Sequence, residues 1–208
     1  MQDLIAGIRT FQRDVYPQYR ELFESLSAEQ SPEALVITCS DSRVDPFLFT
    51  QAQPGQLFVL RNAGNLVPKY DGFVGGVTAT IEFAVVGLRV PNIIVCGHSG
   101  CGAMIGLLHP ETIEDMPNVQ DWLRRHAEPV REILAKTGRL HGPDELPQAI
   151  EANVLVQLEN LRTHPSVAEA LVENRVQLHG WVYDIASGEV RAWNEQWKQF
   201  GPLPYSDR

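Results

Sequence analysis

The chain has few cysteines, an excess of acidic over basic residues and no long apolar run, and each of these features excludes a class of protein. Three cysteines in 208 residues do not make a disulfide framework, because one thiol always remains unpaired. No segment approaches the roughly eighteen consecutive apolar residues of a membrane-spanning helix. A net charge of −9 argues against a nucleic-acid surface, which is expected to be basic.

The first residues also lack the pattern of a secretory signal, since no basic stretch is followed there by an apolar one. These absences together predict a protein of a reducing compartment that binds neither membrane nor nucleic acid. We therefore expect a cytoplasmic location. A protein-shelled microcompartment inside the cell is equally compatible with the sequence.

Short apolar runs alternate with segments of helical periodicity over most of the chain. This alternation predicts an α/β fold with a mainly parallel central sheet flanked by helices, in one domain over residues 1–208. A Ser187-Gly188 turn indicates that the last two strands form a C-terminal hairpin. Strands are expected at 34–38, 57–60, 92–96, 176–183 and 189–193, and helices at 45–50, 75–90, from 103 onwards, 118–137 and 146–174.

Residues 1–26 precede the first strand and form a helical arm. Apolar side chains recur there every three or four residues, for example Leu4, Ile8 and Phe11, which is the pattern of an amphipathic helix. A break is expected at Pro17. An apolar face on such an arm needs a surface to cover it, and a neighbouring subunit is one candidate.

Two of the expected strands end in loops that carry metal-binding side chains. The first is followed by Cys39-Ser40-Asp41-Ser42-Arg43, and the third by Gly97-His98-Ser99-Gly100-Cys101-Gly102. The carboxyl edge of an open α/β sheet is where ligands usually bind. Two cysteines and one histidine are the ligand set of a catalytic zinc with an open fourth position. Cys39, His98 and Cys101 are therefore predicted to bind a metal; the alternative is two core cysteines and an unrelated histidine.

Asp41 and Arg43 are close enough in the chain to form a bidentate pair. Held in this way, Asp41 can accept a hydrogen bond from a hydroxide on the metal. Released, the same carboxylate is a competent fourth metal ligand that closes the site. The alternative for the pair is a surface ion pair without a role in chemistry.

These two motifs, in this order, resemble those of the β-class carbonic anhydrases. The resemblance runs from about residue 30 to about residue 183 and includes Pro54-Gly55, Phe58–Asn62 and Ile81–Val85. It implies a zinc-dependent lyase that hydrates carbon dioxide reversibly to bicarbonate by attack of a zinc-bound hydroxide. It also implies that Zn²⁺ is held by Cys39, His98 and Cys101, and that Asp41 and Arg43 are the catalytic pair.

The resemblance also implies which residues meet the substrate. They are Gln30, which reaches the active site of the partner subunit, Phe58, Ala63 and Phe83 in an apolar pocket for carbon dioxide, and Gly102, whose backbone N–H faces the substrate. The family's position at Phe83 is tyrosine in many relatives, so a hydroxyl role there is absent. The family is dimeric or a higher homo-oligomer of dimers, with the N-terminal helix packed across the partner, which fits the arm.

The chain departs from one subgroup of the family. That subgroup is regulated by bicarbonate through a Trp-x-Gly directly before the first zinc cysteine, where this chain has Val36 and Thr38. The sequence therefore resembles the branch with a permanently open zinc.

Three other functions remain compatible with the sequence. The same zinc hydroxide could hydrolyse carbonyl sulfide or carbon disulfide, the zinc could stabilise a non-catalytic assembly protein, or Cys39 and Cys101 could be a redox pair. The lack of a Cys-x-x-Cys argues against the redox reading. Cys96 is expected in the core, and the tryptophans, Trp122 among them, are expected to serve packing.

Overall fold

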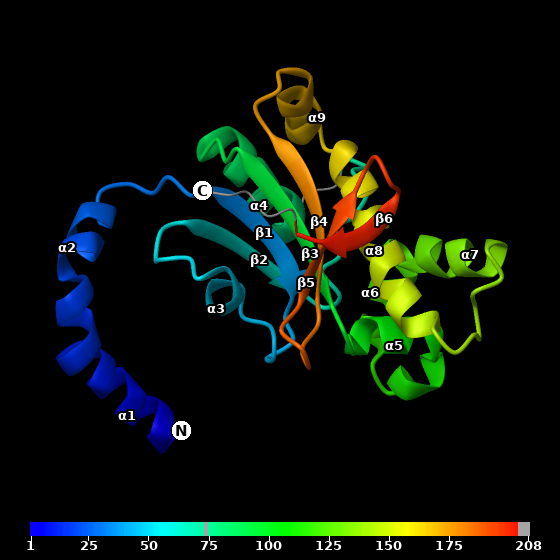
Figure 1. The fold of residues 1–208 in the computed structure, drawn as a ribbon, viewed down its shortest axis with the longest axis horizontal. Helices are drawn as coiled ribbons and strands as arrows, with labels where there is room; N and C mark the ends of the chain where they lie inside the picture. Colours follow the sequence, from blue (N-terminus) through cyan, green and yellow to red (C-terminus); the bar gives the residue numbers. More distant parts are fainter. Residues whose placement is uncertain (73–74, 204–208) are drawn as a thin grey trace.

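A six-stranded sheet forms the centre of the protein (Figure 1). The computed structural model describes residues 1–72 and 75–203. The strand order is β2-β1-β3-β4-β5-β6; the first four strands are parallel, and β5 and β6 are antiparallel to their neighbours. The strands are β1 Ala34–Cys39, β2 Leu57–Asn62, β3 Asn92–His98, β4 Gln177–Tyr183, β5 Val190–Asn194 and β6 Gln199–Pro202. The α/β class, the parallel order and the C-terminal hairpin are confirmed, and β6 is an additional strand that the sequence did not indicate.

The helices are shorter and more numerous than the sequence patterns predicted. They are α1 Gln2–Thr10, α2 Tyr16–Leu26, α3 Pro46–Thr50, α4 Gly76–Glu82, α5 Gly102–Leu108, α6 Pro117–His126, α7 Glu128–Lys136, α8 Glu145–Arg162 and α9 Pro165–Val172. The single helices predicted at 118–137 and 146–174 were wrong, because each is a pair. A proline stands in the first turn of α7 and of α9, where its missing N–H costs nothing but the preceding helix cannot continue through it. Among the described residues, no helix is both long and apolar enough to cross a membrane.

The N-terminal arm consists of α1 and α2 joined by a π-helical turn, Phe11–Val15. The irregularity therefore precedes Pro17, which lies in the first turn of α2, where it is well tolerated. The arm projects away from the sheet in Figure 1, and none of its residues is buried. A second π-helical turn, Phe83–Gly87, continues α4 where one uniform helix was expected.

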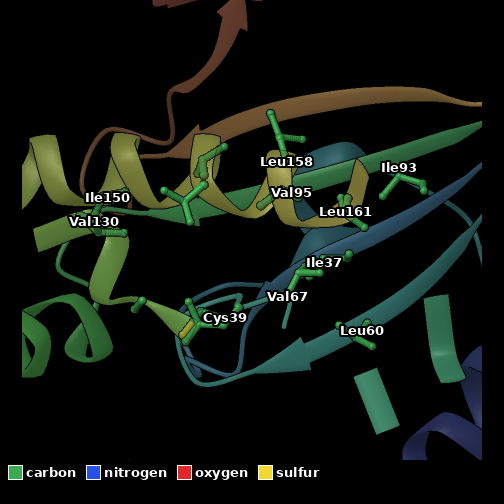
Figure 2. Close-up of a cluster of buried hydrophobic side chains, with 14 of the residues drawn as sticks. Ile37, Cys39, Leu60, Val67, Ile93, Val95, Val130, Ile150, Leu158 and Leu161 are labelled. Atoms are coloured by element: carbon green, nitrogen blue, oxygen red, sulfur yellow. The ribbon is translucent and has the colours of Figure 1, made fainter. Parts of the chain in front are cut away.

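Side chains alternate along the parallel strands between two buried faces. Leu35 and Ile37 belong to the large core under α8, whereas Val36 belongs to a smaller cluster with Ile94 and Cys96 on the other face. Figure 2 shows the large core, with Cys39 at its edge and Ile150, Leu158 and Leu161 of α8 above the strands. Each fully buried aliphatic side chain of this kind contributes about 1.5–3 kcal/mol. The central strands are therefore a rigid support for the loops that follow them.

The strand order brings the two predicted metal loops together. β1 lies between β2 and β3, and its pairing with β3 sets Thr38 beside Cys96. β1 ends one residue after this pair, at Cys39, and β3 ends two residues after it, at His98, so both strands end at the same edge of the sheet. On the far side of β3, α8 packs so closely that a Cβ on Gly97 would come within 3.0 Å of the Val154 side chain. The loop after β3 is thus held against β1 by the packing behind it.

Candidate metal centre

The side chains of Cys39, His98 and Cys101 meet at the carboxyl edge of the sheet. Their ligand atoms all lie within 4.8 Å of one another, and all three residues are buried. Cys39 ends β1, His98 ends β3, and Cys101 immediately precedes α5. Two thiols and an imidazole at this spacing match a three-ligand zinc site. The convergence predicted from the sequence is therefore present in the structure.

The orientation of His98 is suited to a metal ligand. Its Nδ1 lies 3.0 Å from the carbonyl oxygen of Ser99, so a proton on Nδ1 donates to that oxygen. This leaves the Nε2 lone pair free, and Nε2 is buried without a hydrogen-bond partner among the described residues. A buried polar atom without a partner costs about 1–3 kcal/mol. A cation among the three ligand atoms would satisfy it.

The two thiols interact directly. The contact with Cys101 lowers the pKa of Cys39, while the same contact and burial raise the pKa of Cys101. Cys39 is therefore the sulfur that gives up its proton more readily. A divalent cation would take the place of the thiol protons, because both sulfurs bind metals as thiolates. The donor set thus fits a soft divalent metal such as zinc.

Arg43 holds both carboxylate oxygens of Asp41. Its Nε donates to Oδ1 at 2.9 Å, its Nη2 donates to Oδ2 at 2.7 Å, and its backbone N–H donates to Oδ1 at 3.0 Å. Arg43 Nη2 also donates to the carbonyl oxygen of Gly100 at 3.1 Å, which ties the two loops together. The hydrogen bonds from Arg43 hold the pKa of Asp41 well below its usual range. Asp41 is therefore a permanent acceptor, with Oδ2 4.0 Å from His98 Nε2.

Arg61 is a residue of the site that the sequence reasoning missed. Its Nε donates to the carbonyl oxygen of Cys39 at 3.0 Å, and its Nη2 donates to the carbonyl oxygens of Asp41 at 2.7 Å and Val44 at 2.8 Å. These bonds shape the loop that carries the first metal ligand. A charged residue at the carboxyl end of β2 was the available signal, because it lies at the same edge as Cys39.

The loop after β2 also contacts a metal ligand. The backbone N–H of Gly64 donates to Cys39 Sγ at 3.4 Å, and φ of Gly64 is +81°, a conformation that favours glycine. Ala63, predicted to meet the substrate, is the preceding residue. Gly102, also predicted there, is the first residue of α5, next to Cys101, and is exposed. Both residues thus lie at the edge of the cluster.

Three of the predicted substrate residues lie elsewhere in the chain. Phe58 is paired with Leu35, four residues before the Cys39–Asn62 pair, which is about 13 Å along the strand. Phe83 contacts Phe58, with ring centroids 5.9 Å apart, and is 52% exposed. Gln30 is exposed and precedes the amino end of β1. A single chain therefore does not bring these three residues to the metal cluster.

The remaining cysteine is a core residue, as expected. Cys96 is fully buried in the smaller cluster, and burial raises the pKa of its thiol to about 12. All three cysteines are free, so Cys39 and Cys101 are not joined by a disulfide in this structure.

Comparison with known proteins agrees with this geometry. The family model of the carbonic anhydrases matches residues 34–190. The chain is 48% identical over 203 residues to a carbonic anhydrase of Pseudomonas aeruginosa, covering 98% of this chain and 92% of the relative. Among solved structures, the β-carbonic anhydrase CcaA superposes with a TM-score of 0.92 at 44% identity, covering 98% of this chain and 99% of that one. A tetrameric β-carbonic anhydrase of Sordaria macrospora superposes with a TM-score of 0.74 at 32% identity, covering 92% of each chain.

The matched region contains both strand ends and the loops that carry the cluster. At these identities and coverages, family membership follows from the comparison alone, and the clustered cysteines and histidine agree with it. The chain belongs to the β-class carbonic anhydrases, lyases that interconvert carbon dioxide and bicarbonate.

Proposed function

We propose that this protein hydrates carbon dioxide reversibly with a zinc ion held by Cys39, His98 and Cys101. The observation that carries the proposal is the approach of three buried ligand atoms to within 4.8 Å of one another, beside a carboxylate that Arg43 keeps ionised. A zinc ion with three protein ligands supplies a Lewis acid that lowers the pKa of a coordinated water toward neutrality. Family membership supports the same reaction.

Asp41 directs the attacking oxygen. Because its pKa is lowered, the carboxylate accepts hydrogen bonds and does not donate them. The proton of an attacking hydroxyl group therefore points to Asp41, and the oxygen lone pair remains free for the carbon atom of the substrate. Arg43 fixes the direction of the carboxylate through both oxygens. The backbone N–H of Gly102 is proposed to donate to a substrate oxygen, which the open space beside this residue at the start of α5 supports.

A second copy of the chain completes the proposed substrate pocket. Phe83 and Val86 are 52% and 60% exposed, and Leu4 and Ile8 on the arm are 67% and 57% exposed. Exposed apolar groups on a projecting arm and on the π-helical turn Phe83–Gly87 favour a homodimer or a larger homo-oligomer. In such an assembly, Gln30, Phe58 and Phe83 of one subunit would face the metal cluster of the partner. One relative of this chain is described as tetrameric.

The metal is proposed to stay open, without regulation by a bicarbonate ion next to the catalytic pair. The two positions that differ from the regulated subgroup, Val36 and Thr38, are fully buried. Val36 packs in the smaller apolar cluster, and the Thr38 hydroxyl donates to the carbonyl oxygen of Cys96 at 3.0 Å. Neither side chain has a free donor for an anion.

We further propose a cytoplasmic location, in the free cytosol or in a protein-shelled compartment. Three free thiols, two of which are needed as metal ligands, are compatible with a reducing environment.

The experiment that tests the proposal combines metal analysis with carbon dioxide hydration. Purified protein should contain one zinc per chain and show rapid hydration by stopped flow with a pH indicator. Cys101→Ser should lose most of the zinc and the activity. Cys96→Ala is the matched control, because it removes a buried thiol from the opposite face of the sheet and should keep both.

Zinc without hydration activity would contradict the enzymatic proposal and favour a structural role for the metal. Hydrolysis of carbonyl sulfide or carbon disulfide, without hydration of carbon dioxide, would reassign the substrate. Unchanged zinc content in Cys101→Ser would contradict the ligand set.

A further inference from the structure

One peptide unit links a tryptophan of α6 to a metal-ligand sulfur. The indole N–H of Trp122 donates to the carbonyl oxygen of Ala63 at 2.9 Å. The N–H of the same peptide belongs to Gly64 and donates to Cys39 Sγ at 3.4 Å. In a planar trans peptide, the C=O and the N–H point in opposite directions. Holding the oxygen at one end therefore aims the N–H at the sulfur at the other.

The next peptide is held from α8. Asn153 donates through Nδ2 to the carbonyl oxygen of Gly64 at 2.9 Å, and its own Oδ1 accepts from Gln157 Nε2 at 2.9 Å. Gln157 Oε1 in turn accepts from the backbone N–H of Val67 at 2.8 Å. Asn153 and Gln157 are buried, so these bonds are shielded from competing water. Gly64 is thus held on both of its peptides.

The loop that carries Gly64 has little room to change its backbone conformation. A Cβ on Gly64 would lie 2.9 Å from the Cβ of Ala103 on α5, and φ at Gly64 is +81°. Ala103 follows the metal ligand Cys101 by two residues. The peptide therefore fits between the loops of two different ligands, and a rotation of it would move the N–H away from Cys39.

We propose that Trp122 is a positioning residue for the metal centre, and that Asn153 supports it, through the peptide between Ala63 and Gly64. This inference rests on the metal site proposed above. A hydrogen bond to a ligating thiolate lowers the electron density that the sulfur gives to the metal. A donor on the Ala63 oxygen also polarises the peptide and strengthens its N–H as a donor. Trp122 thereby tunes a metal ligand that it does not touch.

The test uses the cobalt(II)-substituted protein, because thiolate-to-cobalt charge-transfer absorption reports directly on the sulfur. Trp122→Phe removes the indole N–H and keeps an aromatic ring against His126, whose ring centroid lies 4.5 Å from that of Trp122. The charge-transfer band should move to longer wavelength, since a sulfur without its hydrogen bond gives up an electron more easily. Zinc affinity, measured by competition with a chelator, should still fall about tenfold, because the loss of orientation at Cys39 outweighs the greater electron density on its sulfur.

Two matched controls separate this effect from loss of packing. Trp193 lies on β5, away from the cluster, and Trp193→Phe removes an indole N–H that donates to Glu195 at 2.7 Å. Asn92→Leu removes an amide that donates to the carbonyl oxygen of Glu33 at 3.1 Å, at the amino end of β3 and therefore at the opposite edge of the sheet from the cluster. Both should leave the band in place. Asn153→Leu should shift the band in the same direction as Trp122→Phe, and it serves as a second variant.

The outcomes are distinguishable. An unchanged band in both Trp122→Phe and Asn153→Leu overturns the positioning role while leaving the metal site intact. An equal shift in the controls also overturns it, because the effect would then be general. A wild-type cobalt protein without thiolate charge-transfer absorption overturns the metal site itself, and this inference with it.

Discussion

Removal of the Arg43 guanidinium should separate catalysis from stability. Arg43→Gln deletes the two side-chain bonds to Asp41, at 2.9 and 2.7 Å, and the bond to the Gly100 carbonyl oxygen at 3.1 Å. The Asp41 carboxylate then loses its fixed direction and becomes free to turn toward the metal cluster, since its Oδ2 is already 4.0 Å from His98 Nε2. Both consequences reduce the rate of hydration.

The expected size of the loss follows from geometry. A misplacement of about 1 Å in a catalytic group costs about 10²-fold in rate, which corresponds to about 2.7 kcal/mol of transition-state stabilisation. The Arg43 side chain is 54% exposed, so solvent screens its ion pair and the pair should contribute little to stability. Activity should therefore fall steeply while the Tm changes little.

The pH dependence supplies a second check. Arg43 lowers the pKa of Asp41, so without Arg43 this pKa rises toward about 3.9. Asp41 remains ionised between about pH 7 and 9 in both proteins, and the activity loss should have the same size across that range. The stabilisation from the pair is present above the unfolded-state pKa of about 3.9 and disappears as the pH falls through the lower folded-state value. The Tm difference between the two proteins should accordingly vanish in strong acid.

The assay is stopped-flow hydration on protein of measured zinc content. Arg43→Lys should recover little activity, because lysine restores the charge but not the bidentate geometry. Arg162→Gln is the control, since it removes an exposed ion pair with Glu159 on α8. Activity of Arg43→Gln within twofold of wild type would refute the reasoning.

Three further variants test other parts of the structure. Gly64→Ala should lose about 2 kcal/mol of stability, because the residue has φ +81° and its new Cβ would lie 2.9 Å from the Cβ of Ala103; thermal unfolding measures this, and an unchanged Tm would contradict it. Arg61→Met should lose about 2–3 kcal/mol and release zinc more rapidly to a chelator, since three carbonyl oxygens of the Cys39 loop lose their donor; wild-type release would show that the loop holds its shape alone. Ile8→Glu should lower the solution mass measured by light scattering, because a charge on the exposed apolar face of the arm opposes its burial against a second copy; an unchanged mass would place the interface elsewhere.

Local signals in the sequence were sufficient for the strands β1 to β5 and for the metal ligands, although not for β6. The apolar runs that became β1 and β3 are short and bounded by polar loops, and strands of that kind lie parallel in the middle of a sheet. Cys39 and His98 each end such a strand, so their convergence required only that the two strands be neighbours. The pairing of Asp41 with Arg43 is equally local, because only Ser42 lies between them.

The helix boundaries were harder to predict from the sequence, because the spacing of apolar residues continues across the point where one helix ends and the next begins. The apolar spacing continues through Ala127 and through His164. The helices nevertheless end there, because a proline in the first turn of the next helix cannot continue the preceding one. Packing of α6 against α7 and of α8 against α9 then sets separate directions for segments that read as one.

Tertiary structure alone decided which distant groups surround the ligands. Trp122 is 59 residues from Ala63 in the chain, and Asn153 is 89 residues from Gly64, so no spacing rule connects them. Phe58 is the converse case. The resemblance assigned it to the substrate, but the strand register places it about 13 Å from Cys39 within one chain. The sequence by itself determined the ligand types and the strands that carry them, because those depend on neighbours along the chain. The hydrogen bonds that orient the ligands depend on how helices pack across the sheet, and only the folded structure contains that information.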